Sequence, residues 1–179
     1  DHMMVISPDE GGMSRAIYIA NVLGLDMGMF YKRRDYTRIV NGRNPIVAHE
    51  FLGTSVEGKN MIIIDDMIAS GESVLEVAAA LKERKAAKIF VFATFGLFTN
   101  GLAGFDKAYE NGLIDRVLTT NLVYQTPELL QRKWYTNCDM SKYIAYIIDT
   151  LNHDSSISDL LNPNERIQSV VSRYRNGEL

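Results

Sequence analysis

Short apolar stretches alternate with stretches of helical periodicity along most of this chain. Where the residues from Met61 to Ile64 are apolar without interruption, the pattern is typical of a strand covered on both faces. The alternation as a whole predicts an α/β fold, a three-layer sandwich in which helices flank a mostly parallel central sheet. The predicted strands are Met4–Ser7, Asp26–Tyr31, Asn60–Ile64, Lys88–Thr94, Arg116–Thr119 and Trp134–Cys138, and the predicted helices are Met13–Leu23, Val74–Lys85, Gly101–Asn111, Met140–Leu151 and Glu165–Tyr174.

The length of 179 residues fits one domain with a sizeable core. Residues 1–3, Asp-His-Met, resemble the remnant of an expression tag and carry no information about the fold. We expect a single domain over residues 4–161, followed by a helical C-terminal extension over residues 162–179. Because a predicted strand directly follows the tag-like residues, we also expect that a preceding domain has been removed.

Composition and charge exclude several classes of protein. The chain has 19 Lys and Arg against 22 Asp and Glu, a net charge of −3, so it lacks the positive field of a non-specific nucleic-acid binder. Its longest apolar runs are too short to span a bilayer, and we find no signal peptide. A single cysteine, Cys138, suits a reducing compartment, and we therefore expect a cytoplasmic protein without nucleic-acid or membrane partners.

The most informative chemistry follows the apolar strand. Asp65 and Asp66 are expected at the carboxyl edge of the sheet, where ligands of open α/β sheets bind. The next residues, Ala69-Ser70-Gly71-Glu72-Ser73, turn into a helix, and the backbone N–H groups of such a turn can hold a dianionic phosphate. Carboxylates accept hydrogen bonds from vicinal hydroxyls, so the whole segment predicts a site for a sugar phosphate.

A simpler interpretation of the same residues is structural. Asp65 and Asp66 would then form a strand-end turn, and Ser70 or Ser73 would cap the following helix. An acidic pair alone would favour this interpretation. The complete order of strand, acidic pair, glycine turn and helix favours the sugar phosphate.

This segment resembles the phosphoribosyl-pyrophosphate signature of the type I phosphoribosyltransferase fold. The flanking stretches Ile6–Gly12 and Tyr31–Arg34 are similar to those of the ribose-phosphate pyrophosphokinase family, as is Ser155–Leu161. The resemblance extends over about Val5–Leu161 but covers only the C-terminal half of a typical member. It implies transfer of the β,γ-diphosphoryl group of Mg-ATP to the 1-hydroxyl of ribose 5-phosphate, which yields phosphoribosyl pyrophosphate and AMP.

The resemblance also implies Mg²⁺ as cofactor, ATP and ribose 5-phosphate as partners, and a homo-oligomeric full-length protein. Because the family's ATP-binding elements belong largely to the other half, we expect this chain alone to bind ribose 5-phosphate without turnover. The implied site residues are Asp9 for the magnesium ion, Lys32 and Arg34 on a mobile loop for the phosphoryl charge, Asp65 and Asp66 for the ribose hydroxyls, and Ala69, Ser70, Gly71, Glu72 and Ser73 for the 5-phosphate.

Three positions depart from the pattern of the resembled families. Ala69 stands where many phosphoribosyltransferases have Asp, Glu72 stands where a neutral residue is usual, and Phe95 replaces a histidine. Two other functions therefore stay open. The chain could be a phosphoribosyltransferase acting on a nucleobase, or a non-catalytic regulatory homologue of the synthetase.

Overall fold

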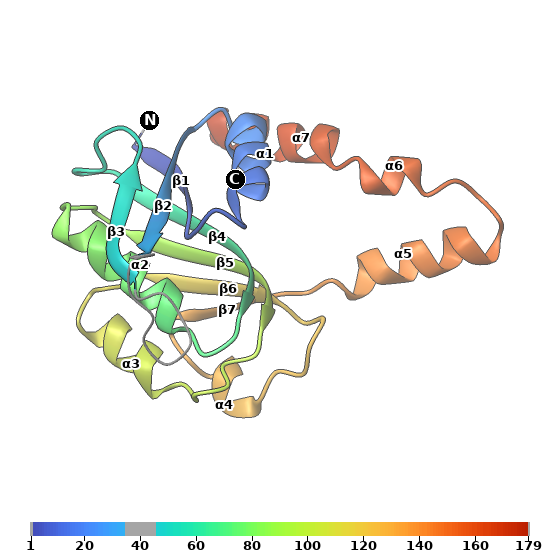
Figure 1. Ribbon diagram of the computed structural model, residues 1–179. Helices are drawn as coiled ribbons and strands as arrows, with labels where there is room; N and C mark the ends of the chain where they lie inside the picture. The colour runs from blue at the N-terminus through green and yellow to red at the C-terminus, as the bar shows by residue number, and fades with distance from the viewer. Residues whose placement is uncertain (1, 35–45, 179) are drawn as a thin grey trace.

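The computed structural model describes residues 2–34 and 46–178, and within them only the backbone of residues 32–34, 46–49 and 159. In this part of the chain, strands form one seven-stranded sheet in the order β3-β2-β1-β4-β5-β6-β7. Neighbouring strands are parallel except for β3, which is antiparallel to β2. Figure 1 shows α1 on one side of the sheet and α2 and α3 on the other. The predicted α/β three-layer sandwich is confirmed.

Most elements lie where the hydrophobic pattern predicts them. The strands are β1 (Met3–Ser7), β2 (Asp26–Arg34), β3 (Ile46–Leu52), β4 (Asn60–Ile68), β5 (Ile89–Gly96), β6 (Arg116–Thr120) and β7 (Tyr135–Cys138). The helices are α1 (Met13–Leu23), α2 (Glu72–Glu83), α3 (Ala103–Glu110), α4 (Pro127–Leu130), α5 (Ser141–Asn152), α6 (Ser158–Leu161) and α7 (Asn164–Arg175).

The central strand β4 is buried on both faces, as its sequence predicts. Its side chains Ile62 and Ile64 pack in a cluster with Ala16 and Ala20 of α1. The alternating residues of the strand point to the opposite face and join the larger core with α2 and α3. Because successive side chains of a strand point to opposite faces, an unbroken apolar run fills both layers.

The largest errors in the predicted strand ends are those of β2 and β4. Strand β2 was expected to end at Tyr31, but it continues through Arg34 because β3 pairs with it, and β3 itself was not predicted. Strand β4 was expected to end at Asp65-Asp66, yet it continues to Ile68 because β5 pairs with it up to Gly96. In both cases the strand is extended by hydrogen bonds from a neighbouring strand. Such pairing cannot be predicted from the polar residues at the strand end.

The C-terminal helices leave the end of β7 and stand away from the sheet before the chain returns to α1 (Figure 1). There α7 packs beside α1, where the Tyr18 hydroxyl donates to Asn164 Oδ1 at 2.9 Å and Gln168 Nε2 donates to the Val22 carbonyl at 2.6 Å. The boundary proposed at residue 161 stays a prediction. No helix within residues 2–34 and 46–178 is long and apolar enough to cross a membrane.

Candidate functional site

In open α/β sheets a crevice lies outside the carboxyl ends of the two neighbouring strands where the strand order reverses, and in this sheet those strands are β1 and β4. The chain passes from β1 to β2 on one side and from β4 to β5 on the other, so the strand order reverses here. Open α/β sheets bind their ligands at such a point. The β1–α1 turn lies close against β4, since a Cβ on Gly12 would lie 2.9 Å from Ser7 Oγ and 3.6 Å from the Ile64 carbonyl oxygen. A side chain at Gly12 would therefore displace the Ser7 hydroxyl, whereas its distance to the Ile64 carbonyl oxygen would be an ordinary van der Waals contact.

The two acidic residues of β4 lie at this crevice, directly after Ile64. The Asp66 backbone N–H donates to Asp65 Oδ1 at 2.8 Å, which fixes the orientation of the Asp65 carboxyl group. The Asp65 side chain is 25% exposed, and burial raises its pKa from 3.8 to about 6. The Asp66 side chain is 63% exposed, and its hydrogen bond with the Asp65 side chain lowers its pKa. Asp66 is thus the more readily ionised member of the pair.

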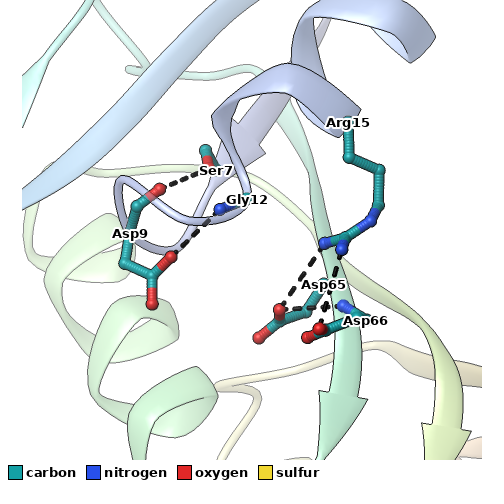
Figure 2. A network of polar contacts seen from close by, with 6 residues as sticks. All are labelled: Ser7, Asp9, Gly12, Arg15, Asp65 and Asp66. Atoms are coloured by element: carbon teal, nitrogen blue, oxygen red, sulfur yellow. Dashed lines mark hydrogen bonds and ion pairs between the residues drawn. The ribbon is translucent and has the colours of Figure 1, made fainter.

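A residue that the sequence analysis did not select, Arg15, reaches both carboxyl groups from α1 (Figure 2). Its Nη1 lies 3.8 Å from Asp65 Oδ1, and its Nη2 lies 3.7 Å from Asp66 Oδ2. The only sequence signal for this residue is its place in the first turn of the helix that follows the glycine pair. Arg15 contacts β4 because α1 packs across the sheet. The position of Arg15 in the sequence does not predict that packing.

The predicted phosphate turn joins β4 to α2. Gly71 has φ of +89°, a conformation that favours glycine, and a Cβ there would overlap the Phe105 ring. The Glu72 backbone N–H donates to Ser70 Oγ at 3.3 Å, whereas the N–H groups of Gly71 and Val74 have no acceptor among the described residues. Because α2 has twelve residues and its dipole is positive at this end, the turn can bind an anion.

The loop after β5 supports this turn from outside. The Thr99 N–H donates to the Ala69 carbonyl oxygen at 2.9 Å, and Asn100 Nδ2 donates to Glu72 Oε1 at 3.1 Å. The Glu72 carboxylate is therefore exposed and directed toward the loop. Ser70 accepts a hydrogen bond through its hydroxyl oxygen, which leaves its O–H free to donate to a ligand, and Ser73 is exposed in the first turn of α2.

The predicted metal ligand, Asp9, lies in the turn on the other side of the crevice. Its Oδ1 accepts from the Gly12 N–H at 3.1 Å, and its carbonyl oxygen accepts from the Ser7 hydroxyl at 2.6 Å (Figure 2). The described residues contain no group of three or more His, Cys, Asp or Glu suited to a metal ion. One carboxylate nevertheless fits Mg²⁺, which keeps several waters and often arrives on substrate phosphates.

The other predicted residues lie on neighbouring strands. Lys32 and Arg34 are among the last residues of β2. The carboxyl end of this strand lies at the same edge of the sheet as that of β1. The structure describes only the backbone of these two residues. Phe95, at the position of the family's histidine, is partly buried in β5 opposite Met67. The fold thus brings the β1–α1 turn, the acidic pair and the phosphate turn together at one edge.

Comparison with known proteins places this arrangement in a family. The family model described as phosphoribosyl synthetase-associated domain matches residues 38–162, more than half of the chain. The chain belongs to this family. The resemblance inferred from the sequence motifs is thereby confirmed.

Individual proteins similar to this chain carry the names of the same family. The chain is 32% identical over 163 residues to the ribose-phosphate pyrophosphokinase of Vibrio parahaemolyticus, covering 90% of this chain and 49% of the relative. It is 36% identical over 158 residues to that of Mycoplasma pneumoniae, covering 87% and 45%. The crystal structure of phosphoribosylpyrophosphate synthetase from Mycobacterium smegmatis matches with a TM-score of 0.72 and 25% identity, covering 87% of this chain and 46% of that one. The chain spans about half the length of the curated relatives it matches.

Proposed function

We propose that this chain forms the ribose 5-phosphate-binding half of a ribose-phosphate diphosphokinase. The observation that carries the proposal is the turn around Gly71, with unpaired N–H groups at the start of α2, beside Asp65 and Asp66 at the strand-order reversal. This arrangement offers a phosphate site and acceptors for two vicinal hydroxyls within one crevice. The names of the relatives support the same activity.

In the proposed reaction, the phosphate turn holds the 5-phosphate and the acidic pair accepts hydrogen bonds from the ribose hydroxyls. The 1-hydroxyl oxygen forms a bond to the β-phosphorus of ATP while the bond from that phosphorus to the bridging α,β-oxygen breaks, so that AMP leaves and the hydroxyl proton passes to solvent. Lys32 and Arg34 stabilise the charge on the transferred phosphoryl groups. Asp9 would hold Mg²⁺, which when bound supplies charge neutralisation for the phosphates.

The proposal extends to the whole protein. Its substrates are ribose 5-phosphate and Mg-ATP, and the full-length protein is a cytoplasmic homo-oligomer that binds neither nucleic acid nor membrane. The resemblance assigns most ATP-binding elements to the other half of the family's chains. We therefore predict that the present chain binds ribose 5-phosphate but produces no AMP by itself, and robust synthesis by this chain would contradict the prediction.

Calorimetric titration with ribose 5-phosphate tests the site directly. Gly71→Ala is expected to lower the affinity at least about 30-fold, because an added Cβ forces the turn away from Phe105 and out of its left-handed conformation. Gly101→Ala is the matched control, since Gly101 has φ of +77° but no atom within 4 Å of an added Cβ, and it is expected to change affinity less than about 3-fold. Equal affinities in both variants would refute the phosphate turn. Circular dichroism of each variant separates loss of binding from loss of folding.

The catalytic part is tested in a full-length protein that contains this chain, by measuring AMP formation from ATP and ribose 5-phosphate. Lys32→Ala is expected to lower kcat by about 10² to 10³, the usual cost of removing one group that stabilises the transition state. An activity indifferent to this substitution would refute the role of Lys32. If the protein bound ribose 5-phosphate but formed no AMP, the result would instead favour a non-catalytic regulatory homologue. The departures from the family pattern at Ala69, Glu72 and Phe95 would agree with that function.

A further inference from the structure

A cavity of about 410 Å³ lies between the β5–α3 loop, the start of α3, and α4 with the loop before it. Figure 1 shows α4 near the start of α3. None of the residues of the acidic pair or of the phosphate turn lines this cavity. Its volume is within the range of about 300–1,000 Å³ that is usual for small-molecule sites. The cavity is therefore large enough for a ligand of its own.

Apolar side chains form most of the cavity wall. Phe98 and Leu129 are buried there, whereas Leu97 is 44% exposed. Tyr124 also lines the cavity and is 80% exposed. An exposed aromatic ring beside an apolar wall offers contact area that a ligand with an apolar part can cover.

The wall is held in shape by the packing around Phe98. This residue has φ of +48°, which is unusual for a bulky side chain. Its ring lies 5.1 Å from the Phe105 ring, edge to face, and 5.9 Å from the Trp134 ring. The preceding Leu97 N–H donates to the Ile68 carbonyl oxygen at 2.9 Å. Contacts on several sides thus fix a strained residue, so the wall is formed before any ligand binds.

The charged groups of the wall leave one negative charge without a partner. Asp106 Oδ1 accepts from Trp134 Nε1 at 2.8 Å and lies 2.9 Å from Arg132 Nε. Of the described residues that line the cavity, Arg132 alone is cationic, and Asp106 already pairs with it. The exposed Glu128 side chain has no ion-pair or hydrogen-bond partner in the described part of the chain. The wall therefore attracts a cation more than an anion.

We propose that this cavity binds an organic ammonium ion whose apolar part is an aromatic or branched aliphatic group. The apolar part lies against Leu97 and Phe98. The ammonium group donates to Glu128 and lies near the Tyr124 ring, whose face attracts cations. The carboxylate of an α-amino acid, or a phosphate, would lie beside Asp106 and Glu128 and is disfavoured. The assignment does not depend on the function proposed for the crevice.

An NMR titration of the isotope-labelled chain with 2-phenylethylamine tests the site. We expect a Kd of about 1 mM or lower, which is within the limit for so small a ligand. The largest shift changes are expected at the backbone amides of Leu97, Leu102 and Leu129, which line the cavity. 2-Phenylethanol has the same shape without the charge, and L-phenylalanine adds a carboxylate. Each of these two compounds is expected to bind at least about 5-fold more weakly.

Two substitutions at exposed positions test the named contacts. Glu128→Gln is expected to weaken binding of 2-phenylethylamine at least about 5-fold and to change that of 2-phenylethanol less than about 2-fold. Tyr124→Ala is expected to weaken binding of the amine about 3-fold. The matched controls are Glu83→Gln and Tyr174→Ala, which alter an exposed acid and an exposed tyrosine outside the cavity and should have less than about a 2-fold effect. Thermal unfolding of each variant verifies that the fold is retained.

The outcomes separate this site from the proposed function. A selective loss of amine binding in Glu128→Gln but not in Glu83→Gln would support the inference. Equal binding of the amine and the alcohol, tighter binding of L-phenylalanine, or shift changes confined to the phosphate turn would overturn it. None of these measurements uses a phosphorylated sugar, so their failure would leave ribose 5-phosphate binding to be decided by its own titration.

Discussion

Among the described residues, Asp65 is a carboxyl group whose pKa lies well above its ordinary value. Its carboxyl group is held by the Asp66 N–H and is largely withdrawn from water, so its pKa rises to about 6. The ionised form is the acceptor that ribose hydroxyls require. Since a phosphate monoester also loses its second proton near pH 6, ligand affinity should rise as the pH increases through this range.

The same pKa shift predicts a pH-dependent stability. Because the folded pKa is about 6 and the ordinary value is 3.8, the folded state binds more protons than the unfolded state between these values. The free energy of unfolding therefore falls as the pH rises from about 4 to 6. Asp65→Asn removes this penalty and is expected to be more stable than the native chain by about 1 kcal/mol at pH 7.5, a figure reduced for solvent screening. The difference should disappear near pH 3.5.

Urea denaturation across this pH range measures the free energy of unfolding of each variant. Asp66→Asn serves as a control in which the expected change of stability has the opposite sign. The pKa of Asp66 is lowered in the folded state, so its ionised form contributes stability above the ordinary pKa that is lost as the pH falls. Asp66→Asn is expected to be less stable than the native chain at pH 7.5. If both substitutions changed stability in the same direction, the assignment of the two carboxyl groups would be wrong.

Helix α2 begins at the proposed phosphate turn, and its first residue is acidic. Glu72 lies in its first turn, where a carboxylate is favoured by the helix dipole. A bound phosphate would compete for the same positive end, although the Glu72 side chain is drawn toward Asn100. The acid therefore stabilises the free helix and opposes the ligand.

We accordingly predict that Glu72→Gln raises the affinity for ribose 5-phosphate about 3- to 10-fold and lowers stability by about 0.5 kcal/mol. Titration calorimetry and urea denaturation measure the two effects. Glu83→Gln, at the other end of the same helix, serves as the control and should leave the affinity unchanged. Weaker binding in Glu72→Gln would show instead that the carboxylate takes part in the site.

The whole molecule has a sheet with its site at one edge and C-terminal helices that stand away from it (Figure 1). None of the residues of α5 and α7 is buried, and α7 is held beside α1 through exposed polar contacts to Tyr18 and Val22. These contacts are with residues of α1 and not with residues of the phosphate turn. The C-terminal segment should therefore contribute little to ligand binding.

Removal of residues 162–179 tests this expectation. We predict a loss of about 1 kcal/mol of stability, since a few exposed hydrogen bonds contribute about 0.5–1.5 kcal/mol each at most. Ribose 5-phosphate affinity should remain within about 2-fold of that of the complete chain. A large loss of affinity would show that α7 positions the site through α1, and gel filtration would show whether the segment also affects association.

The sequence predicted the elements whose pattern is local. Met61–Ile64 identified the central strand because an unbroken apolar run fills two core layers, and α1 was predicted with its observed bounds, with Gly24 ending it in a left-handed conformation. The sequence failed where pairing decides the structure. β3, and the extension of β2 through Arg34, depend on antiparallel hydrogen bonds between segments that are not adjacent in the sequence.

The candidate site divides in the same way. The acidic pair and the glycine turn lie close together in the sequence, in the last part of β4 and directly after it, so their chemistry could be inferred from the order of residues alone. The sequence could not show that Arg15 lies against that pair, or that Gly12 lies beside the Ile64 carbonyl, because both follow from α1 packing across β4. Local spacing determines which groups follow a strand, whereas the strand order and the packing of helices on the sheet decide which distant groups meet them.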